Sequence, residues 1–108
     1  MKFMIIEELK FEIPTEFQQE FIRKDALIWT ALLREIPGFK SKTVNINKDI
    51  STEIIIVIYW QSRMHWEAIP KEVIINTIKV FEKEMSKTGI VIGRPKEITI
   101  TELKEEVL

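Results

Sequence analysis

The chain has 108 residues, no cysteine, one histidine and a formal net charge of −1. The lack of cysteine excludes disulfides, thiolate metal sites and cysteine nucleophiles, and one histidine excludes a histidine-rich metal site within one chain. A charge near zero, with both signs interspersed, argues against binding of nucleic acid or of an anionic membrane. The length favours a single domain over residues 1–108, and the short apolar start, which soon meets acidic residues, leads us to expect a cytoplasmic protein.

Residues 3–13 are predicted to form a strand, because apolar and polar side chains alternate along them. One face is apolar and is interrupted only by Glu7; it consists of Phe3, Ile5, Leu9, Phe11 and Ile13. The other face is polar along half of its length and consists of Met4, Ile6, Glu8, Lys10 and Glu12.

A helix is predicted from Pro14 to the stop-and-turn pair Pro37–Gly38, with Thr15 as a candidate N-cap. Apolar side chains recur along it at helical spacing: Phe17, Phe21, Ile28, Leu32 and Ile36, with Ile22, Trp29 and Leu33 beside them. Asp25 is the exception, a carboxylate inside this apolar stripe.

Two further strands are predicted over residues 40–48 and 53–60, joined by a polar hairpin loop at 47–52. The run 53–60 is apolar on both of its faces, which are formed by Ile54, Ile56, Ile58 and Trp60 on one side and by Ile55, Val57 and Tyr59 on the other. Such a strand is expected in the middle of a sheet with both faces covered.

The second helical region is predicted to begin after Ser62, which can cap a short helix over residues 63–69. Pro70 interrupts the pattern and suits the first position of a longer helix. The expected buried stripe of that helix consists of Val73, Ile74, Ile78, Phe81 and Met85. Gly89 suits the position after the helix, and alternation over residues 97–103 predicts a fourth strand.

The predicted order is β-α-β-β-α-β, the split βαβ arrangement of an α+β, ferredoxin-like fold. It gives an antiparallel four-stranded sheet with both helices on one face and with the first and third strands in the centre. The other face would expose an apolar patch around Ile55, Val57 and Tyr59, which is unusual on a monomer. The simplest cover is the same face of a second copy, so the sequence predicts a homodimer.

The chain resembles the dimeric α+β barrel superfamily, in particular the antibiotic-biosynthesis-monooxygenase-like domains. The features that carry the resemblance are the element order, the turn Pro37-Gly38-Phe39, and Tyr59-Trp60-Gln61-Ser62 followed by Arg63 and Trp66. A further pattern is similar to a small group of mostly bacterial proteins without known activity; it consists of Lys24-Asp25, Ile28-Trp29-Thr30, Pro37-Gly38-Phe39, Lys42, Trp66 and Ile69-Pro70. The resemblance implies a homodimeric barrel, and the superfamily includes cofactor-free quinol-forming oxygenases, haem-degrading enzymes and decarboxylases.

The haem-degrading branch of the superfamily has an asparagine in the first strand and an iron-binding histidine along the second helix. In this chain Ile6, Glu7 and Glu8 occupy the first of these regions, and no histidine follows Pro70. Trp66 also lies closer to the preceding strand than the tryptophan of that pattern. The comparison speaks against haem degradation, and we expect neither a cofactor nor a metal.

Asp25 and His65 are the candidate catalytic residues. A carboxylate in an apolar stripe can act as a general base with a raised pKa. The structural alternative is that Asp25 reaches solvent or accepts a hydrogen bond from an indole or backbone group. His65 could shuttle protons near neutral pH, although a lone histidine at a helix start is more often an exposed or capping residue.

Three tryptophans and three polar residues are candidate ligand-binding residues. Trp29, Trp60 and Trp66 could line an aromatic pocket, since a buried indole needs a partner for its N–H, although ordinary core or dimer packing is the commoner role for each taken singly. The polar candidates would converge on the barrel interior if the helices take the more apolar face of each strand. They are Glu8, Asn45 and Tyr59, together with Thr99, and their alternative role is to pair across strands or across the dimer.

Two functional hypotheses follow. The first is a homodimeric barrel that binds a small apolar or aromatic molecule and acts as a cofactor-independent monooxygenase. The second is a non-enzymatic dimeric binding or regulatory module whose barrel is filled by its own side chains. An open, partly polar cavity reached by Asp25 or His65 would favour the first hypothesis, and a packed interior would favour the second.

Overall fold

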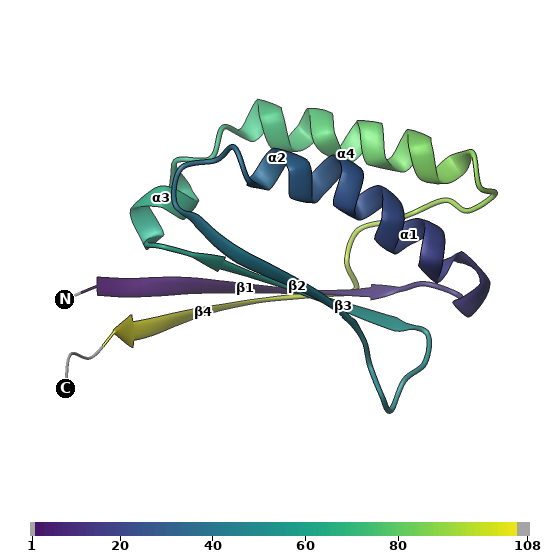
Figure 1. The fold of residues 1–108 in the computed structure, drawn as a ribbon, viewed down its shortest axis with the longest axis horizontal. Coiled ribbons are helices and arrows are strands. Elements are labelled where there is room, and N and C mark those ends of the chain that lie inside the picture. The colour runs from purple at the N-terminus through teal and green to yellow at the C-terminus, as the bar shows by residue number, and fades with distance from the viewer. Residues whose placement is uncertain (1, 106–108) are drawn as a thin grey trace.

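The computed structural model describes residues 2–105. It contains one antiparallel sheet, ordered β2-β3-β1-β4, whose strands are β1 (Lys2–Glu12), β2 (Phe39–Ile46), β3 (Glu53–Trp60) and β4 (Glu97–Glu105). The helices are α1 (Gln18–Asp25), α2 (Ala31–Leu33), α3 (Arg63–Glu67) and α4 (Lys71–Ser86). The sequence order and the central positions of β1 and β3 confirm the predicted α+β fold (Figure 1).

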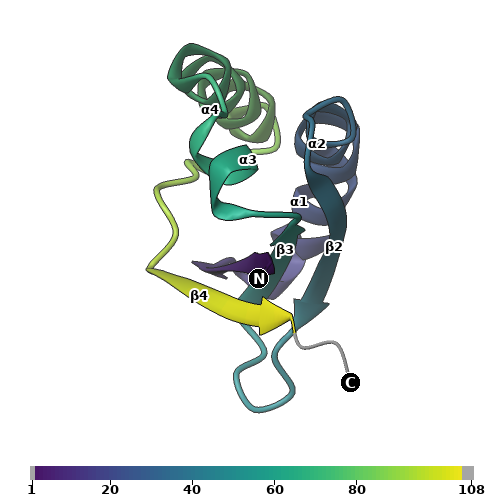
Figure 2. The ribbon, with the colours of Figure 1, turned by 90° about the vertical axis from the view of Figure 1, so that its left-hand side faces the viewer.

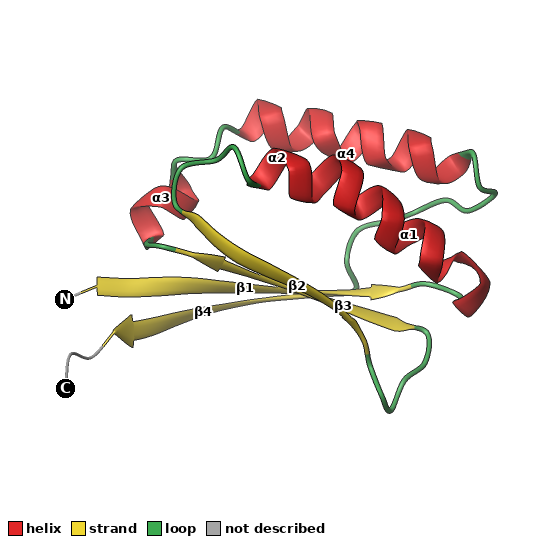
Figure 3. Cartoon of the chain, viewed as in Figure 1, coloured by secondary structure: helices red, strands yellow, loops and turns green. Residues whose placement is uncertain are grey.

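All the helices lie on one side of the sheet, so the described chain forms two layers (Figures 2 and 3). The loop between β2 and β3 projects away from the helices, and no described element covers the opposite face of the sheet. None of the helices within residues 2–105 is both long and apolar enough to cross a membrane.

The core lies between the two layers and is built on the face of β3 that carries Ile54, Ile56, Ile58 and Trp60, all buried. From the helical layer, Phe21 of α1 meets Phe81 of α4 edge to face, with ring centroids 5.3 Å apart. Every second residue of β3 therefore points into the core of this chain. The other face, with Ile55, Val57 and Tyr59, is only half-buried.

The first helical region departs from the single regular helix that its apolar spacing predicts. It begins with a short 3-10 helix (Thr15–Phe17) and contains a π-helix (Ala26–Thr30) between α1 and α2. The prediction that Thr15 caps the helix was wrong, since Pro14 is the residue before the first turn and no side chain caps it. The spacing of apolar residues averages about 3.6 per turn over the whole region. It therefore cannot show where one turn is narrowed to a 3-10 helix or widened to a π-helix.

Two turns depend on glycine, because Gly38 and Gly89 have φ angles of +90° and +98°. Gly89 lies two residues beyond Lys87, the cap of α4, and so one position further than predicted. Gly38 connects the first helical region to β2 and lies under α3, where a Cβ atom would come within 2.3 Å of the Cβ of His65. A side chain at position 38 is therefore excluded both by backbone conformation and by space.

Candidate functional site

A cavity of about 690 Å³ lies between the helices and the sheet. Its floor is formed by β1 and β3, and its walls by α1, the π-helix, α3, α4 and the segment that leads to β4. The walls are mainly apolar and include Leu9, Phe11, Leu33, Ile69, Ile74 and Ile78. The cavity is open because the helices leave the edge of the sheet uncovered, so that Ile98 on the helix-facing side of β4 stays 56% exposed.

This opening also explains why the second helix is less buried than its pattern predicts. Phe81 and Met85 are buried, but Val73 and Ile74 are half-buried and Ile78 is exposed. Ile74 and Ile78 line the cavity instead of filling the core. Their apolar surface is therefore available to a ligand.

Asp25 lines the cavity and forms an ion pair with Lys42 of β2, with 2.6 Å between Lys42 Nζ and Asp25 Oδ2. Lys42 Nζ also donates a hydrogen bond to Thr30 Oγ1 at 2.9 Å. In a regular α-helix, residues five apart such as Asp25 and Thr30 point about 140° away from each other. The wider π turn lets both reach the same ammonium group, and such turns are frequent at functional sites.

The two side chains of this pair are only 3% and 4% exposed, so water cannot solvate them. Burial raises the pKa of Asp25, and the neighbouring Lys42 offsets only part of that effect. Burial likewise lowers the pKa of Lys42, again against the effect of its partner. Both shifts favour the neutral forms, which makes proton exchange between these groups easier than it would be in water.

Glu7 is a second acidic group at the floor of the cavity, on the helix-facing side of β1. Its Oε1 atom accepts a hydrogen bond from Trp60 Nε1 at 3.2 Å. Burial raises the pKa of Glu7, and the indole hydrogen bond counteracts the rise. In the strand register Glu7 and Lys42 both pair with Ile58, so one rung of the sheet carries both polar groups.

All three tryptophans of the chain line this cavity. Trp60 is buried in the floor, Trp29 comes from the π-helix and Trp66 from α3. The Arg63 guanidinium lies over the Trp66 ring, 5.9 Å from its centroid. The cavity thus combines the half-buried rings of Trp29 and Trp66 with polar groups, whereas Trp60 is 1% exposed and adds little surface.

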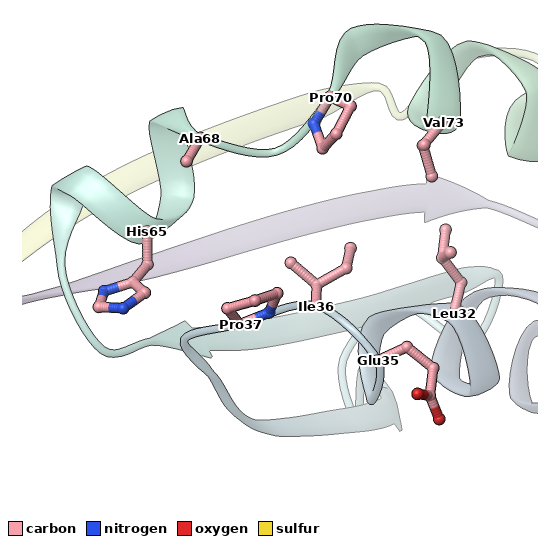
Figure 4. A pocket seen from close by; sticks show the side chains of 8 residues that line it. All are labelled: Leu32, Glu35, Ile36, Pro37, His65, Ala68, Pro70 and Val73. Atoms are coloured by element: carbon pink, nitrogen blue, oxygen red, sulfur yellow. The ribbon is translucent and has the colours of Figure 1, made fainter.

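His65 lies apart from this cavity. It borders a smaller depression of about 340 Å³ on the other side of α3, together with Pro37 and Val73 (Figure 4). The His65 backbone N–H donates to Ser62 Oγ, as predicted for a capping serine, and His65 Nδ1 lies 2.7 Å from the same oxygen. The structure therefore does not bring His65 and Asp25 together.

Glu8, Asn45 and Tyr59 lie on the face of the sheet that points away from the helices, and Thr99 shares this face. This is the common face that the alternation predicts for them, but no element of residues 2–105 covers it. The candidate residues therefore divide among the helix-side cavity, the His65 depression and the open sheet face.

Glu7 and Lys42 belong to the cavity although neither was among the candidates. The signal in the sequence was a charged residue at a core-facing position of an alternating strand, as Glu7 is in β1. Lys42 shares the parity of Val44 and Ile46, so alternation also placed it towards the helices. Within residues 2–105 no three His, Cys, Asp or Glu side chains are grouped so that they could hold a metal ion.

Comparison with solved structures finds proteins of the same architecture. A conserved protein from Methanosarcina mazei Go1 has a TM-score of 0.66 and 17% identity over 94% of this chain and 93% of its own. The monooxygenase from the gene ActVA-Orf6 of Streptomyces coelicolor, in complex with the ligand nanaomycin D, has a TM-score of 0.63 and 17% identity over 99% and 91%. A Bordetella bronchiseptica protein, provisionally assigned as an antibiotic biosynthesis monooxygenase, has a TM-score of 0.66 and 12% identity over 97% and 98%. The chain has the antibiotic biosynthesis monooxygenase-like fold.

The resemblance seen in the sequence is confirmed at this level. No sequence-family model matches the chain, and a search of curated proteins also found no match. Because one monooxygenase-like fold can support several chemistries, the function has to be inferred from the cavity itself.

Proposed function

We propose that the helix-side cavity binds a small aromatic molecule and that the protein oxygenates it as a cofactor-independent monooxygenase. The observation that carries this proposal is the cavity of about 690 Å³, in which three indoles and aliphatic walls surround Glu7, Asp25 and Lys42. Its size and its mainly apolar walls are typical of small-molecule sites. The solved complex of a monooxygenase of this fold with nanaomycin D supports the same class of ligand.

The substrate would supply the electrons in this reaction. When a phenol reacts with O₂ to give a quinone, it loses the hydroxyl proton and one ring hydrogen. One oxygen atom enters the ring and the other leaves as water. The apolar walls exclude water and orient the ring, which brings the reacting groups together at high effective concentration. A carboxylate in the cavity accepts the hydroxyl proton, and the Lys42 ammonium stabilises negative charge that develops on the substrate oxygen.

Binding and turnover can be measured separately. Because every tryptophan lines the cavity, an aromatic hydroxyl compound that enters it should quench the intrinsic fluorescence. Oxygen consumption in an electrode chamber then reports turnover, and Lys42→Met should abolish it. The matched control Lys40→Met changes an exposed lysine of the same strand and should behave as the wild-type protein. Quenching without oxygen consumption would contradict the enzymatic proposal and favour the non-enzymatic binding module.

We also propose that the protein is a homodimer joined through the open sheet face. In a single chain this face leaves Ile6, Ile55, Val57 and Tyr59 only half-buried and Leu103 50% exposed. An apolar patch of this kind is typical of an interface, and a second copy is its simplest cover. The glutamate, asparagine and tyrosine on this face would then be enclosed between the two sheets.

A further inference from the structure

We propose that Glu7 selects aromatic ligands that carry a hydroxyl group, by accepting a hydrogen bond from that hydroxyl at the floor of the cavity. This inference rests on the proposed function, because it specifies which members of the aromatic class the cavity takes. Three observations support it: the position of Glu7 in the sheet, the hydrogen bond that Trp60 donates to Glu7 Oε1, and the apolar neighbours of Glu7.

Apart from the Trp60 indole, whose N–H it accepts, Glu7 has no polar partner among its described neighbours. On its face of the sheet it lies opposite Ile58 of β3 and Ile100 of β4. No described lysine, arginine or histidine forms an ion pair with it. A carboxyl group in such a place is costly unless its oxygen atoms find partners. Trp60 is the partner of Oε1. No buried side-chain oxygen of the described residues lacks a partner, so Oε2 is accessible from the cavity, where we assign the ligand as its partner.

Trp60 determines which oxygen atom is left for the ligand. An indole N–H can only donate, so Glu7 Oε1 is committed as its acceptor at 3.2 Å. No hydrogen bond from the described residues reaches Glu7 Oε2. An ionised carboxylate accepts hydrogen bonds and donates none, so the ligand must bring the donor. Among molecules that suit three indoles and aliphatic walls, an aromatic ring with a hydroxyl group meets this requirement without bringing a charge that must be desolvated.

The same geometry predicts what glutamine at this position would do. The Trp60 indole would still need an acceptor and would take the amide oxygen of Glu7→Gln. The amide NH₂ group would then occupy the place of Oε2 and would present a donor to the cavity. This variant should favour ligands whose oxygen can only accept.

The test uses two probes of similar shape, 2-naphthol and its methyl ether 2-methoxynaphthalene. The ether keeps the rings and the oxygen but lacks the donor. Isothermal titration calorimetry at about pH 8, above the ordinary range of a carboxyl group, would measure both affinities. We expect the wild-type protein to bind 2-naphthol about tenfold more tightly than the ether, as one charge-assisted hydrogen bond allows.

Glu7→Gln should remove or reverse this preference. Glu72→Gln makes the same change of charge at an exposed position of α4 and should retain it. Equal wild-type affinities for the two probes would overturn the role of Glu7 and leave the aromatic cavity standing. A wild-type preference that Glu7→Gln leaves intact would do the same. If neither probe binds the wild-type protein, the proposed function fails together with this inference.

Discussion

At the scale of single residues, the Asp25–Lys42 pair differs from the other ion pairs of the described chain because both of its side chains are almost inaccessible to water. Each charge has lost its hydration and depends on the other, with Thr30 as an additional acceptor. Such a pair contributes little net stability compared with two apolar residues, but it is costly to break. Its presence beside a cavity is therefore better explained by function than by stability.

Changing one partner should destabilise the protein strongly. Asp25→Asn leaves the Lys42 ammonium without a counter-charge, and we expect a loss of about 3–5 kcal/mol in the free energy of unfolding. The double variant Asp25→Asn, Lys42→Met should lose less than the sum of the two single variants, because the unpaired charge is gone. Urea denaturation near neutral pH measures all three. Additive effects would mean that the two groups do not act as a pair.

Glu7 should make stability depend on pH. Burial raises its pKa above the ordinary value of 4.5, so the folded state binds this proton more tightly than the unfolded state. The contribution of Glu7 to stability is therefore present at low pH and is lost as pH rises from about 4.5 through the raised pKa. The difference in free energy of unfolding between Glu7→Gln and the wild-type protein should shift in favour of the variant over this range. A difference that is constant with pH would contradict the raised pKa.

At the scale of elements, the turn at Gly38 joins the helical layer to β2 and also supports α3 through its contact with His65. Gly38→Ala should cost about 1–3 kcal/mol of stability, because alanine is strained at a φ of +90° and its methyl group would overlap His65. Gly89→Ala is the matched control, since its φ is similar but a Cβ atom there meets nothing within 4 Å. Thermal unfolding compares the two. Equal losses would show that backbone strain alone accounts for the effect.

The sequence predicted the elements well where the pattern is regular. The strand over 53–60 has the predicted bounds, and Ser62 caps α3 as expected. Pro70 and Gly89 flank α4, each one position further from the helix than expected. Alternation also assigned faces correctly, since Glu7 interrupts the core-facing side of β1. The π-helix could not be foreseen, because it changes the direction of side chains without changing the composition of the stripe.

The site could be predicted only in part, for a reason of tertiary packing. The tryptophans and Asp25 were recognised from residue type, but their meeting in one cavity depends on how far α4 lies from the edge strand. Lys42 could not be identified as the partner of Asp25, because it lies in β2, beyond the Gly38 turn. The sequence does not show which β2 residue reaches the helix. The separation of His65 from Asp25 likewise follows from the position of α3, which no local pattern records.

At the scale of the whole molecule, the two faces of the sheet have different roles. One face packs against the helices and forms the floor of the cavity. No described element covers the other face. A charge in the middle of the open face should therefore prevent association while leaving the fold intact, because that side chain points away from the core.

Val57→Lys places such a charge on β3. We expect light scattering at micromolar concentration to show a dimer for the wild-type protein and a monomer for this variant. Val80→Lys, at a 50% exposed position of α4, provides the same substitution on the helical side and should remain a dimer. A wild-type protein that is monomeric at this concentration would rule out the proposed interface.

The shared rung of Glu7, Ile58 and Lys42 has a consequence for protein engineering. The backbones that carry the two polar groups are separated by two strand spacings, roughly 10 Å, and hydrogen bonds hold that distance fixed. The two polar side chains therefore start from a fixed separation on the sheet, while the helices form the other walls of the cavity. Replacing Glu7 by Asp would shorten one of these side chains by one methylene group without altering the sheet. The range of accepted ligands could therefore be tuned in steps of known size.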